Sequence, residues 1–342
     1  MWVASSTELT LKPTAVALGK FDGVHLGHHK VIQPILPPAL EQTRRKEQEN
    51  TPTSSPTQPT QPPEQTYSTV VTFNPHPLEF FTGQPRPLLT PLDEKVQQLR
   101  SLGVEQLVLL PFDKELSALS PQDFVEQILV KQLQCRRISV GQDFCFGKQR
   151  RGTAKDLQLL AAKYHIPVTI VSLQTYTDHA PTQETPISTS LIRHYLESGE
   201  VKNANLLLGR PYTLIGTVVQ GEKMGRTIGF PTANLQLPQN KFIPRYGVYA
   251  VRAAIVSETP DVTTPDQNLG VMNIGNRPTV NGSKLSVEVH LFDWCSDLYG
   301  KKLAVQLVEF LRAEQKFPCL EHLKTQIQLD CDIAREVLRP KC

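Results

Sequence analysis

The chain has 342 residues, which is enough for two domains that each bury a hydrophobic core. Its 39% hydrophobic and 20% charged residues are typical of a globular protein and exclude fibrous and wholly disordered classes. A formal net charge of +3 is too small to indicate a surface for nucleic acid or for a membrane, so we expect neither as a partner.

The six cysteines are scattered and form no C-x-x-C pair, so the sequence indicates neither a zinc site nor a redox dithiol. In a chain of this size they are typical of reduced cytosolic thiols. The first residues lack a basic start followed by an apolar stretch, which argues against a signal peptide, and no apolar run is long enough to span a bilayer. We therefore expect a cytoplasmic protein.

The stretch Ala17–Lys30, ALGKFDGVHLGHHK, leads from a β-like run into a helix. The run breaks at Gly19, and Asp22-Gly23 is a turn signal. A helical pattern then places His25 and His28 on one face of the first turn. Because a helix N-terminus attracts phosphate and two imidazoles add donors, the stretch predicts a phosphate site. The alternative is a strand, turn and helix that carry two surface histidines.

The string G-x-F-D-G-x-H-x-G-H resembles the H-x-G-H signature of the nucleotidyltransferase superfamily, and this version is similar to its flavin adenylyltransferase branch. The visible departure is Lys20, at a variable position. The resemblance implies catalytic roles for His25 and His28, as donors to the α- and β-phosphates of ATP. The predicted ATP- and phosphate-binding residues of this stretch are Gly19, Phe21, Asp22, Gly23, His25 and His28.

The helix after His28 is expected to run through Ile32 and to end at Pro34, Pro37 and Pro38. Residues from about 38 to 66 hold almost nothing apolar, so they cannot offset the entropy of ordering the chain. We expect a disordered surface insertion there, with a partner-docking segment as the alternative.

Tyr67–Phe73 is rich in β-branched residues and predicts a buried strand that ends at Asn74-Pro75-His76-Pro77. Ligands of open α/β sheets bind beyond the carboxyl ends of strands, so Asn74 and His76 are candidate flavin-binding residues. A purely structural turn is the alternative.

Helical and strand patterns then alternate as far as residue 173. Helices are expected over Pro91–Leu102, from Ser120 and over Thr153–His165, and strands over Gln106–Leu110, Arg137–Val140 and Pro167–Leu173. This alternation predicts an α/β fold with a doubly wound parallel sheet.

The segment Gly141–Gly147 follows a predicted strand in the same way. Asp143 would accept a hydrogen bond from a ligand, and Phe144 or Phe146 would either stack on a ring or belong to the core. Asp143 and Phe144 are therefore candidate flavin-binding residues. The basic residues after them would meet phosphates or form a solvated loop; they are Lys148, Arg150 and Arg151.

Three hydroxyl residues and an arginine meet at the start of a predicted helix in Ile187–Arg193, ISTSLIR. Any one of these hydroxyl groups could simply cap the helix. Three hydroxyl groups together with Arg193 predict a second site that binds phosphate. The string is similar to the I-S-S-T-x-I-R motif of the same superfamily, with Thr and Ser exchanged. The resemblance implies that Ser188, Thr189 and Arg193 hold the departing pyrophosphate.

The second half changes to strand periodicity after two connecting helices, Leu191–Ser198 and Val201–Leu208. Short strands punctuated by Gly, Pro and Asn predict a small antiparallel β-barrel. A helix over Leu320–Val337 is expected to pack against it. The expected strands are Tyr212–Gln220, Val248–Val256, Leu269–Ile274, Ser286–Leu291 and Lys302–Phe310.

Polar residues in this half suggest a second chemistry. Thr232 and Asn234 lie two residues apart and would point to the same side of an extended chain, offering the hard oxygen ligands that Mg²⁺ accepts alongside ATP phosphates. Gly225-Arg226 lies in a flexible loop before them. Glu288 is a carboxylate on an otherwise apolar strand, which makes it a candidate functional residue. The alternative is a charge that simply faces solvent on an alternating strand.

These stretches together resemble the riboflavin kinase barrel, with its G-F-P-T-A-N, N-I-G-x-x-P-T and E-x-H-x-x-D-x-x-x-D-L-Y-G patterns. The resemblance implies that Glu288 is a catalytic general base, that Thr232 and Asn234 bind Mg²⁺, and that Gly225 and Arg226 cover ATP phosphates. Because it carries both sets of motifs, the chain resembles the bifunctional prokaryotic riboflavin kinase/FAD synthetase family.

Membership of that family would imply riboflavin, FMN, FAD and ATP as partners, with Mg²⁺ required. The expected domains are residues 1–185 for FMN adenylylation, 186–209 as a connector, and 210–342 as a kinase barrel with its C-terminal helix. One alternative is a different H-x-G-H adenylyltransferase, acting on pantetheine phosphate or a nicotinate nucleotide, with a non-catalytic barrel. Another is a non-catalytic flavin- or RNA-binding protein.

Overall fold

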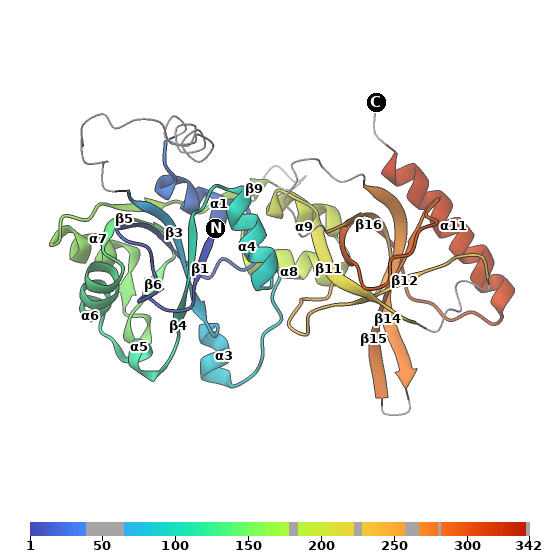
Figure 1. Ribbon diagram of the computed structural model, residues 1–342, viewed down its shortest axis with the longest axis horizontal. Helices are drawn as coiled ribbons and strands as arrows, with labels where there is room; N and C mark the ends of the chain where they lie inside the picture. The colour runs from blue at the N-terminus through green and yellow to red at the C-terminus, as the bar shows by residue number, and fades with distance from the viewer. Residues whose placement is uncertain (39–64, 178–183, 222–227, 257–266, 280–281, 340–342) are drawn as a thin grey trace, which may run out of the picture. The chain divides into compact units, whose positions relative to one another are not determined.

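The computed structural model describes residues 1–38, 65–177, 184–221, 228–256, 267–279 and 282–339 (Figure 1). The chain divides into two compact units, which are described one at a time. The first contains Met1–Arg86 and Leu92–Ile187, and the second contains Pro87–Pro91 and Ser188–Cys342. Almost all of the expected insertion, and the loop Gly225-Arg226, lie outside the described residues.

A sheet of six parallel strands forms the centre of the first unit, in the order β1-β4-β3-β2-β5-β8 (Figure 1). The strand order reverses at β2, because β3 pairs with one of its edges and β5 with the other. This arrangement confirms the predicted doubly wound sheet. The strands are β1 (Trp2–Ala4), β2 (Thr14–Leu18), β3 (Tyr67–Asn74), β4 (Gln106–Pro111), β5 (Cys135–Gly141) and β8 (Val168–Val171).

Helices cover both faces of this sheet. Side chains alternate along a strand, so Val16 and Leu18 of β2 join the core that contains Leu157 of α7, whereas Ala15 and Ala17 join the core under α1 and α4. The helical segments are α1 (Leu26–Ile32), η1 (Gln33–Ile35), α3 (Pro77–Thr82), α4 (Leu92–Ser101), α5 (Lys114–Ala118), α6 (Pro121–Asp123), η2 (Phe124–Gln132), η3 (Lys148–Arg150) and α7 (Ala154–Ala162). Two small hairpins pair β6 (Cys145–Phe146) with β7 (Gly152–Thr153), and β9 (Thr175–Thr177) with β10 (Glu184–Pro186).

Some elements of this unit differ from the sequence-based expectation. The edge strand β1 has only three residues, too few for a periodic pattern, and it forms because β4 offers an edge to pair with. The helix expected from Ser120 exists, and the Ser120 hydroxyl caps it by accepting from the Asp123 amide. Beyond Asp123, however, it continues as the π-helix η2. Helix α1 ends at Ile32, as expected, and Pro34 lies in the 3-10 turn η1 that follows it.

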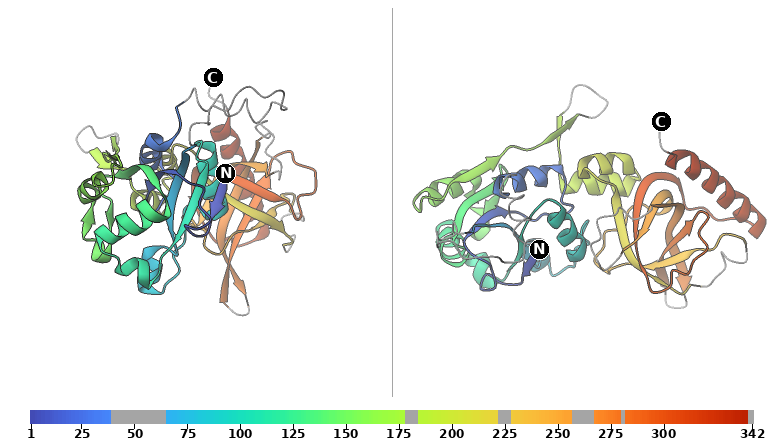
Figure 2. Two further views of the ribbon diagram at one scale, coloured as in Figure 1. Left: turned by 60° about the vertical axis from the view of Figure 1, so that its left-hand side comes forward. Right: turned by 45° about the horizontal axis from the view of Figure 1, so that its top comes forward.

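The second unit is built on a closed antiparallel barrel (Figure 2). Its strands follow the order β11-β12-β15-β14-β13-β16, which confirms the predicted barrel. Alternate residues of β11 are buried, as a half-exposed barrel strand requires. The sequence pattern missed β12, whose four residues follow a proline. The strands are β11 (Tyr212–Val219), β12 (Ala233–Gln236), β13 (Gly247–Ile255), β14 (Asn268–Thr279), β15 (Gly282–Leu291) and β16 (Lys302–Ala313).

Two helices precede the barrel, α8 (Thr189–Ser198) and α9 (Val201–Leu208), and each ends at a glycine in the left-handed conformation. Asn205 fastens α9 to the barrel. Its amide nitrogen donates to the Leu307 carbonyl at 2.9 Å, and its amide oxygen accepts from the Tyr212 backbone at 2.6 Å.

The five residues Pro87–Pro91 are part of this second unit although both of their flanks belong to the first. The Leu88 amide donates to Asn240 at 2.6 Å, and the Phe242 amide donates to the Leu88 carbonyl at 2.8 Å. The buried Lys241 ammonium donates to the Leu89 carbonyl at 2.8 Å. The segment is therefore hydrogen-bonded into the structure of the second unit.

The C-terminal helix α11 (Leu320–Leu338) packs along the outside of the barrel through Cys331, Ala334 and Leu338 (Figure 2). It confirms the helix expected over Leu320–Val337. It has 19 residues, yet neither it nor any other described helix is long and apolar enough to cross a membrane.

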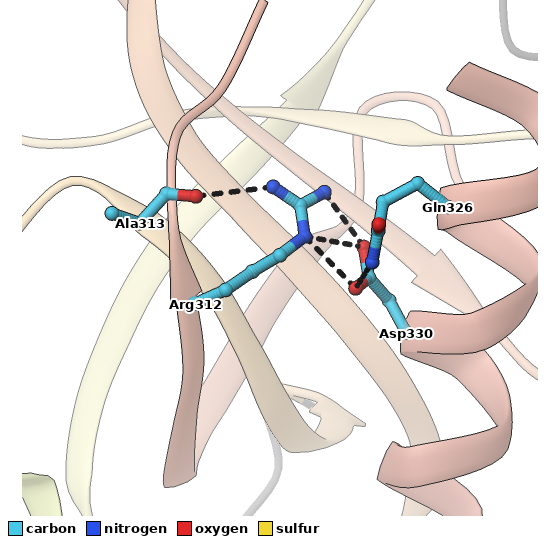
Figure 3. Close-up of polar contacts among 4 residues, drawn as sticks. All are labelled: Arg312, Ala313, Gln326 and Asp330. Atoms are coloured by element: carbon cyan, nitrogen blue, oxygen red, sulfur yellow. Dashed lines mark hydrogen bonds and ion pairs between the residues drawn. The ribbon is translucent and has the colours of Figure 1, made fainter. Parts of the chain in front are cut away.

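An ion pair ties α11 to β16 (Figure 3). Arg312 donates from Nε and Nη2 to the Asp330 carboxylate at 2.9 and 2.7 Å, and the Gln326 amide also donates to Asp330 at 2.9 Å. The Asp330 side chain is only 4% exposed and that of Arg312 is 21% exposed. Removing the guanidinium would therefore leave a carboxylate with little access to water.

We expect Arg312→Met to lower the free energy of unfolding of the second unit by about 3 kcal/mol, since a buried charge would lose its partner. Lys202→Met is the matched control, because its pair with Glu309 is exposed and is worth at most about 1 kcal/mol. Urea unfolding, with hydrogen exchange of the α11 amides, measures both. Equal losses in the two variants would contradict the role given to Arg312.

Candidate active sites

The first candidate site lies at the carboxyl ends of β3, β2 and β5, which are neighbours in the sheet. Lys20, His76 and Asp143 each follow the last residue of one of these strands by two positions. Because parallel strands end at one edge of the sheet, the topology brings these three positions to the same edge. This edge flanks the point where the strand order reverses, which is where ligands of such folds bind.

His25 and His28 lie together at the start of α1, as predicted. His25 is the N-cap, and its Nδ1 accepts from the His28 amide at 3.4 Å. His28 Nδ1 accepts in return from the His25 amide at 3.3 Å. The two rings stack with their centroids 3.7 Å apart. This is a capping box in which imidazoles replace the usual hydroxyl and carboxylate.

The reciprocal cap fixes which ring nitrogen carries the proton. Each Nδ1 accepts from a backbone N–H, so each neutral ring holds its hydrogen on Nε2. In that tautomer the Nε2 atoms of His25 and His28 can donate hydrogen bonds beside the helix N-terminus. That is the geometry expected of groups that bind phosphoryl oxygens.

The turn before α1 is held in an uncommon conformation. Phe21, Gly23 and Val24 have φ values of 47°, 89° and 42°, and Val24 is β-branched, for which such a value is rare. Phe21, Val24 and Asp22 are buried, so the surrounding side chains hold this strained backbone in place. A Cβ at Gly19 would lie 3.1 Å from the Phe21 ring, which explains the glycine there.

The Lys20 carbonyl anchors this turn from within the unit. It accepts from the Thr72 hydroxyl at 2.9 Å and from the Lys95 ammonium at 3.3 Å. Lys95 is buried, and burial lowers its pKa, while the charge of Asp22 opposes that shift. Sequence reasoning missed Lys95, because only the fold brings α4 beside the turn.

His76 follows β3 and is the N-cap of α3, where its Nδ1 accepts from the Leu78 amide at 3.1 Å. Burial, followed by the positive charges of Lys20 and Arg86, lowers the pKa of His76 to about 4. The ring is therefore neutral near pH 7 and carries its hydrogen on Nε2. Asn74, the last residue of β3, is exposed at the same strand end.

The loop after β5 places the remaining predicted flavin-binding residues. Asp143 is exposed, and Phe144 is half-buried and stacked at 5.8 Å on the buried Phe146. The ring centroids of Phe146 and Phe124 lie 5.4 Å apart, so Phe146 belongs to the hydrophobic core. Membership of the core was one of the two roles predicted for it, and stacking on a ligand was the other.

An aromatic cluster at the ends of β3 and β4 escaped the sequence analysis. Phe112 meets Phe73, Phe80 and Phe81 edge-to-face, with centroids 5.3 to 5.8 Å apart. Phe81 remains 69% exposed. The cluster offers an apolar surface beside Asn74, and the neighbouring phenylalanines in the sequence were its only signal.

In the second unit, Ser188 and Arg193 make structural contacts. The Ser188 hydroxyl caps α8 by accepting from the Leu191 amide at 3.2 Å, which is the alternative that the sequence left open. The Arg193 guanidinium donates to the Pro87 carbonyl and lies 4.7 Å from the centre of the Phe242 ring. Thr189 is the first residue of α8. Phosphate binding by these residues stays a prediction.

The second candidate site lies where β12 and β15 pair in the barrel. Asn234 is directly opposite Glu288, so their side chains point to the same side of the sheet. The Glu288 carboxylate accepts from the Ser286 hydroxyl at 2.9 Å and from the Thr232 hydroxyl at 3.4 Å. The structure thus brings together Thr232, Asn234 and Glu288, which the sequence proposed as one site.

Two further residues shape this site. A Cβ on Gly221 would lie well inside van der Waals contact with the terminal atoms of Asn234, so the glycine makes room for that side chain. His290 Nδ1 lies 2.8 Å from the Pro231 carbonyl and holds the segment before β12 against β15. Neither role could be assigned from the local sequence pattern.

The oxygen atoms of this site suit a hard cation. In the part of the chain that the structure describes, no group of three or more His, Cys, Asp or Glu side chains could hold a metal ion. Thr232 and Asn234 instead offer a set of two oxygen ligands, a hydroxyl and an amide oxygen, beside the Glu288 carboxylate. Such a set fits Mg²⁺, which takes few protein ligands and completes its octahedron with water and phosphate oxygens.

Comparison with known proteins agrees with this division of the chain. A riboflavin kinase family model matches residues 208–338, and an FAD synthetase family model matches residues 7–50 and 57–185. A bifunctional riboflavin kinase/FMN adenylyltransferase of Escherichia coli K12 is 38% identical, with 94% of this chain and 91% of the relative covered. The Bacillus subtilis protein of the same name is 35% identical, with 93% and 90% covered.

A solved structure is also similar over nearly the whole chain. The crystal structure of a protein described as a macrolide-efflux protein from Streptococcus pneumoniae gives a TM-score of 0.76 at 27% identity. The comparison covers 97% of this chain and 98% of that one. The resemblance therefore extends to both folds, the parallel sheet and the barrel.

Proposed function

This chain belongs to the bifunctional riboflavin kinase/FMN adenylyltransferase family, and from that premise we propose which residues perform each of its two reactions. The enzyme phosphorylates riboflavin with ATP to FMN, and then transfers AMP from a second ATP to FMN to give FAD and pyrophosphate. The observation that carries this function is the match of two different family models to two parts of one chain.

Incubation of the purified protein with riboflavin, ATP and Mg²⁺, followed by chromatography, tests both steps. FMN and then FAD are the expected products. The alternative of another adenylyltransferase with a non-catalytic barrel is not favoured, since the kinase model matches the barrel and the Thr232–Glu288 contact lies within it.

For the kinase step, we propose Glu288 as the general base. Its carboxylate would accept the proton of the riboflavin 5′-hydroxyl as that oxygen attacks the γ-phosphorus of ATP. The hydroxyls of Ser286 and Thr232 donate to its two oxygens and hold the carboxylate in a fixed orientation.

Thr232 and Asn234 would hold Mg²⁺, which when bound would reduce the negative charge of the ATP phosphates. Gly221, two residues after the end of β11, leaves room for the Asn234 side chain. Gly225 and Arg226 remain proposed phosphate contacts and lie outside the described residues.

We expect Gly221→Ala to raise the KM for Mg-ATP in the kinase reaction about tenfold, because the added methyl group would displace the Asn234 amide. FMN adenylylation in the same sample should not change. Asn234→Ala and the double variant complete a cycle, in which the double variant should be no worse than Asn234→Ala alone. Additive losses would show that Gly221 acts in some other way.

For the adenylyl step, we propose that His25 and His28 donate from Nε2 to the phosphates of ATP, with the turn from Gly19 to Gly23 lying against the nucleotide. The FMN phosphate would attack the α-phosphorus directly, so positioning and electrostatic stabilisation supply the catalysis. Ser188, Thr189 and Arg193 are the proposed ligands of pyrophosphate. The proposed flavin contacts are Asn74, His76, Asp143 and Phe144.

We also propose a cytoplasmic location, where ATP is present and scattered thiols stay reduced. The partners would then be riboflavin, FMN, FAD and ATP. Neither composition nor charge favours a nucleic acid or a membrane surface.

A further inference from the structure

Lys20 and Arg86 come from two loops that the sheet brings to one edge. Lys20 follows β2, and its main chain is held by the hydrogen bonds from Thr72 and Lys95 to its carbonyl. Arg86 is held beside His76 by Glu79, whose carboxylate accepts from the His76 amide at 3.0 Å and from the Arg86 amide at 2.9 Å. Both cations are thus held at the main chain, Lys20 after the end of β2 and Arg86 beside His76, which follows β3.

Positive charge is concentrated here. Burial and then the charges of Arg150 and Arg86 lower the pKa of Lys20, and Asp143 only partly opposes them. The same two cations, Lys20 and Arg86, also contribute to the low pKa of His76. Among the described residues, neither the Lys20 ammonium nor the Arg86 guanidinium has a hydrogen-bond or ion-pair partner, and the two Glu79 oxygens accept from backbone amides.

A fold that holds like charges together, and directs the Glu79 carboxylate to the main chain of His76 and Arg86, favours an anionic ligand. Phosphoryl oxygens are the ligands that guanidinium and ammonium groups bind best. The adenylyl reaction brings two such anions together, the FMN phosphate and the ATP triphosphate, and their mutual repulsion must be offset.

We propose that Lys20 and Arg86 form a phosphoryl-binding subsite of the adenylyl-transfer reaction, beside His76. This inference rests on the proposed function of the first unit. It deepens that function by adding two binding residues beyond the H-x-G-H turn, one of them at a position that the motif leaves open.

Steady-state kinetics of Lys20→Met and Arg86→Met, with FMN and ATP varied separately, test the subsite. We expect a KM increase of about tenfold or more in each, since one charge-assisted contact is lost. A change in the KM for FMN would place the subsite on the acceptor, and a change in the KM for ATP or in inhibition by pyrophosphate would place it on the nucleotide. Lys20→Arg should retain most of the affinity.

The controls separate this inference from the function on which it rests. Lys155→Met removes an exposed lysine of α7 and should leave both activities unchanged. The riboflavin kinase activity of every variant reports that the second unit is folded, and the retained kcat for FAD synthesis reports the same for the first. If the unmutated enzyme makes FAD and both variants keep normal KM values, the subsite does not exist. If the unmutated enzyme makes no FAD, the proposed function itself fails.

An NMR titration of His76 gives a readout that does not depend on turnover. Its pKa should be about 4 in the unmutated protein and higher in Lys20→Met, because one of the charges that lower it is gone. Lys155→Met should leave it unchanged. An unchanged His76 pKa in Lys20→Met would show that the two side chains do not share a site.

Discussion

The Glu288→Gln variant should form FMN from riboflavin about 10²–10⁴-fold more slowly than the unmutated enzyme, while converting added FMN to FAD at the normal rate. Glutamine keeps the shape of the side chain but cannot accept a proton from the riboflavin hydroxyl. Because the variant residue can still accept a hydrogen bond from Ser286 or Thr232, the loss should appear in kcat rather than in folding.

The two activities of one chain make this test internally controlled. Rates of FMN formation from riboflavin and of FAD formation from FMN are measured on the same preparation. Glu321→Gln, an exposed position in the first turn of α11, is the matched substitution and should be neutral in both assays. Full kinase activity in Glu288→Gln would remove the carboxylate from the mechanism.

The His28→Ala variant should show the opposite pattern, with FMN accumulating and FAD synthesis reduced about 10²–10³-fold, as for the loss of one preorganised donor. The imidazole has two roles in the structure. Its Nδ1 caps α1 by accepting from the His25 amide, and its Nε2 is the proposed phosphate donor. Alanine removes both, so a second variant must separate them.

His28→Glu keeps a capping acceptor at this position of the helix but places a negative charge where the donor was. We expect it to fold normally and to lose FAD synthesis as fully as alanine. His165→Asn is the control, since His165 is exposed and has a φ of 57°, which asparagine tolerates. FAD synthesis that survives in His28→Glu would refute the donor role, whatever the alanine variant does.

The sequence predicted most of the fold because its signals are local. Alternating helical and strand patterns predict the doubly wound sheet, and short strand patterns between turn residues predict the barrel. The elements it missed owe their structure to partners elsewhere in the chain. β1 has three residues and needs the edge of β4, and β12 has four and pairs with β11 and β15.

For the candidate sites, motif spacing found the residues but not how they are held. The spacing placed His25 near His28, yet it did not show that each ring caps the other's amide, which fixes the donor atom. Likewise, the contact of Gly221 with Asn234 depends on how the strand after the loop returns beside it. Such contacts depend on tertiary geometry, and no local pattern encodes them.

The segment Pro87–Pro91 bears on any attempt to dissect this enzyme into single-activity fragments. The polypeptide enters the second unit at residue 87, leaves it after residue 91 and returns at Ser188. A truncation at Ser188 would therefore deprive the barrel fragment of the Leu89 carbonyl that Lys241 binds and of the Pro87 carbonyl that Arg193 binds. The excised sheet fragment would carry the same five residues without their hydrogen-bonding partners, so the two catalytic modules do not separate at a single cut.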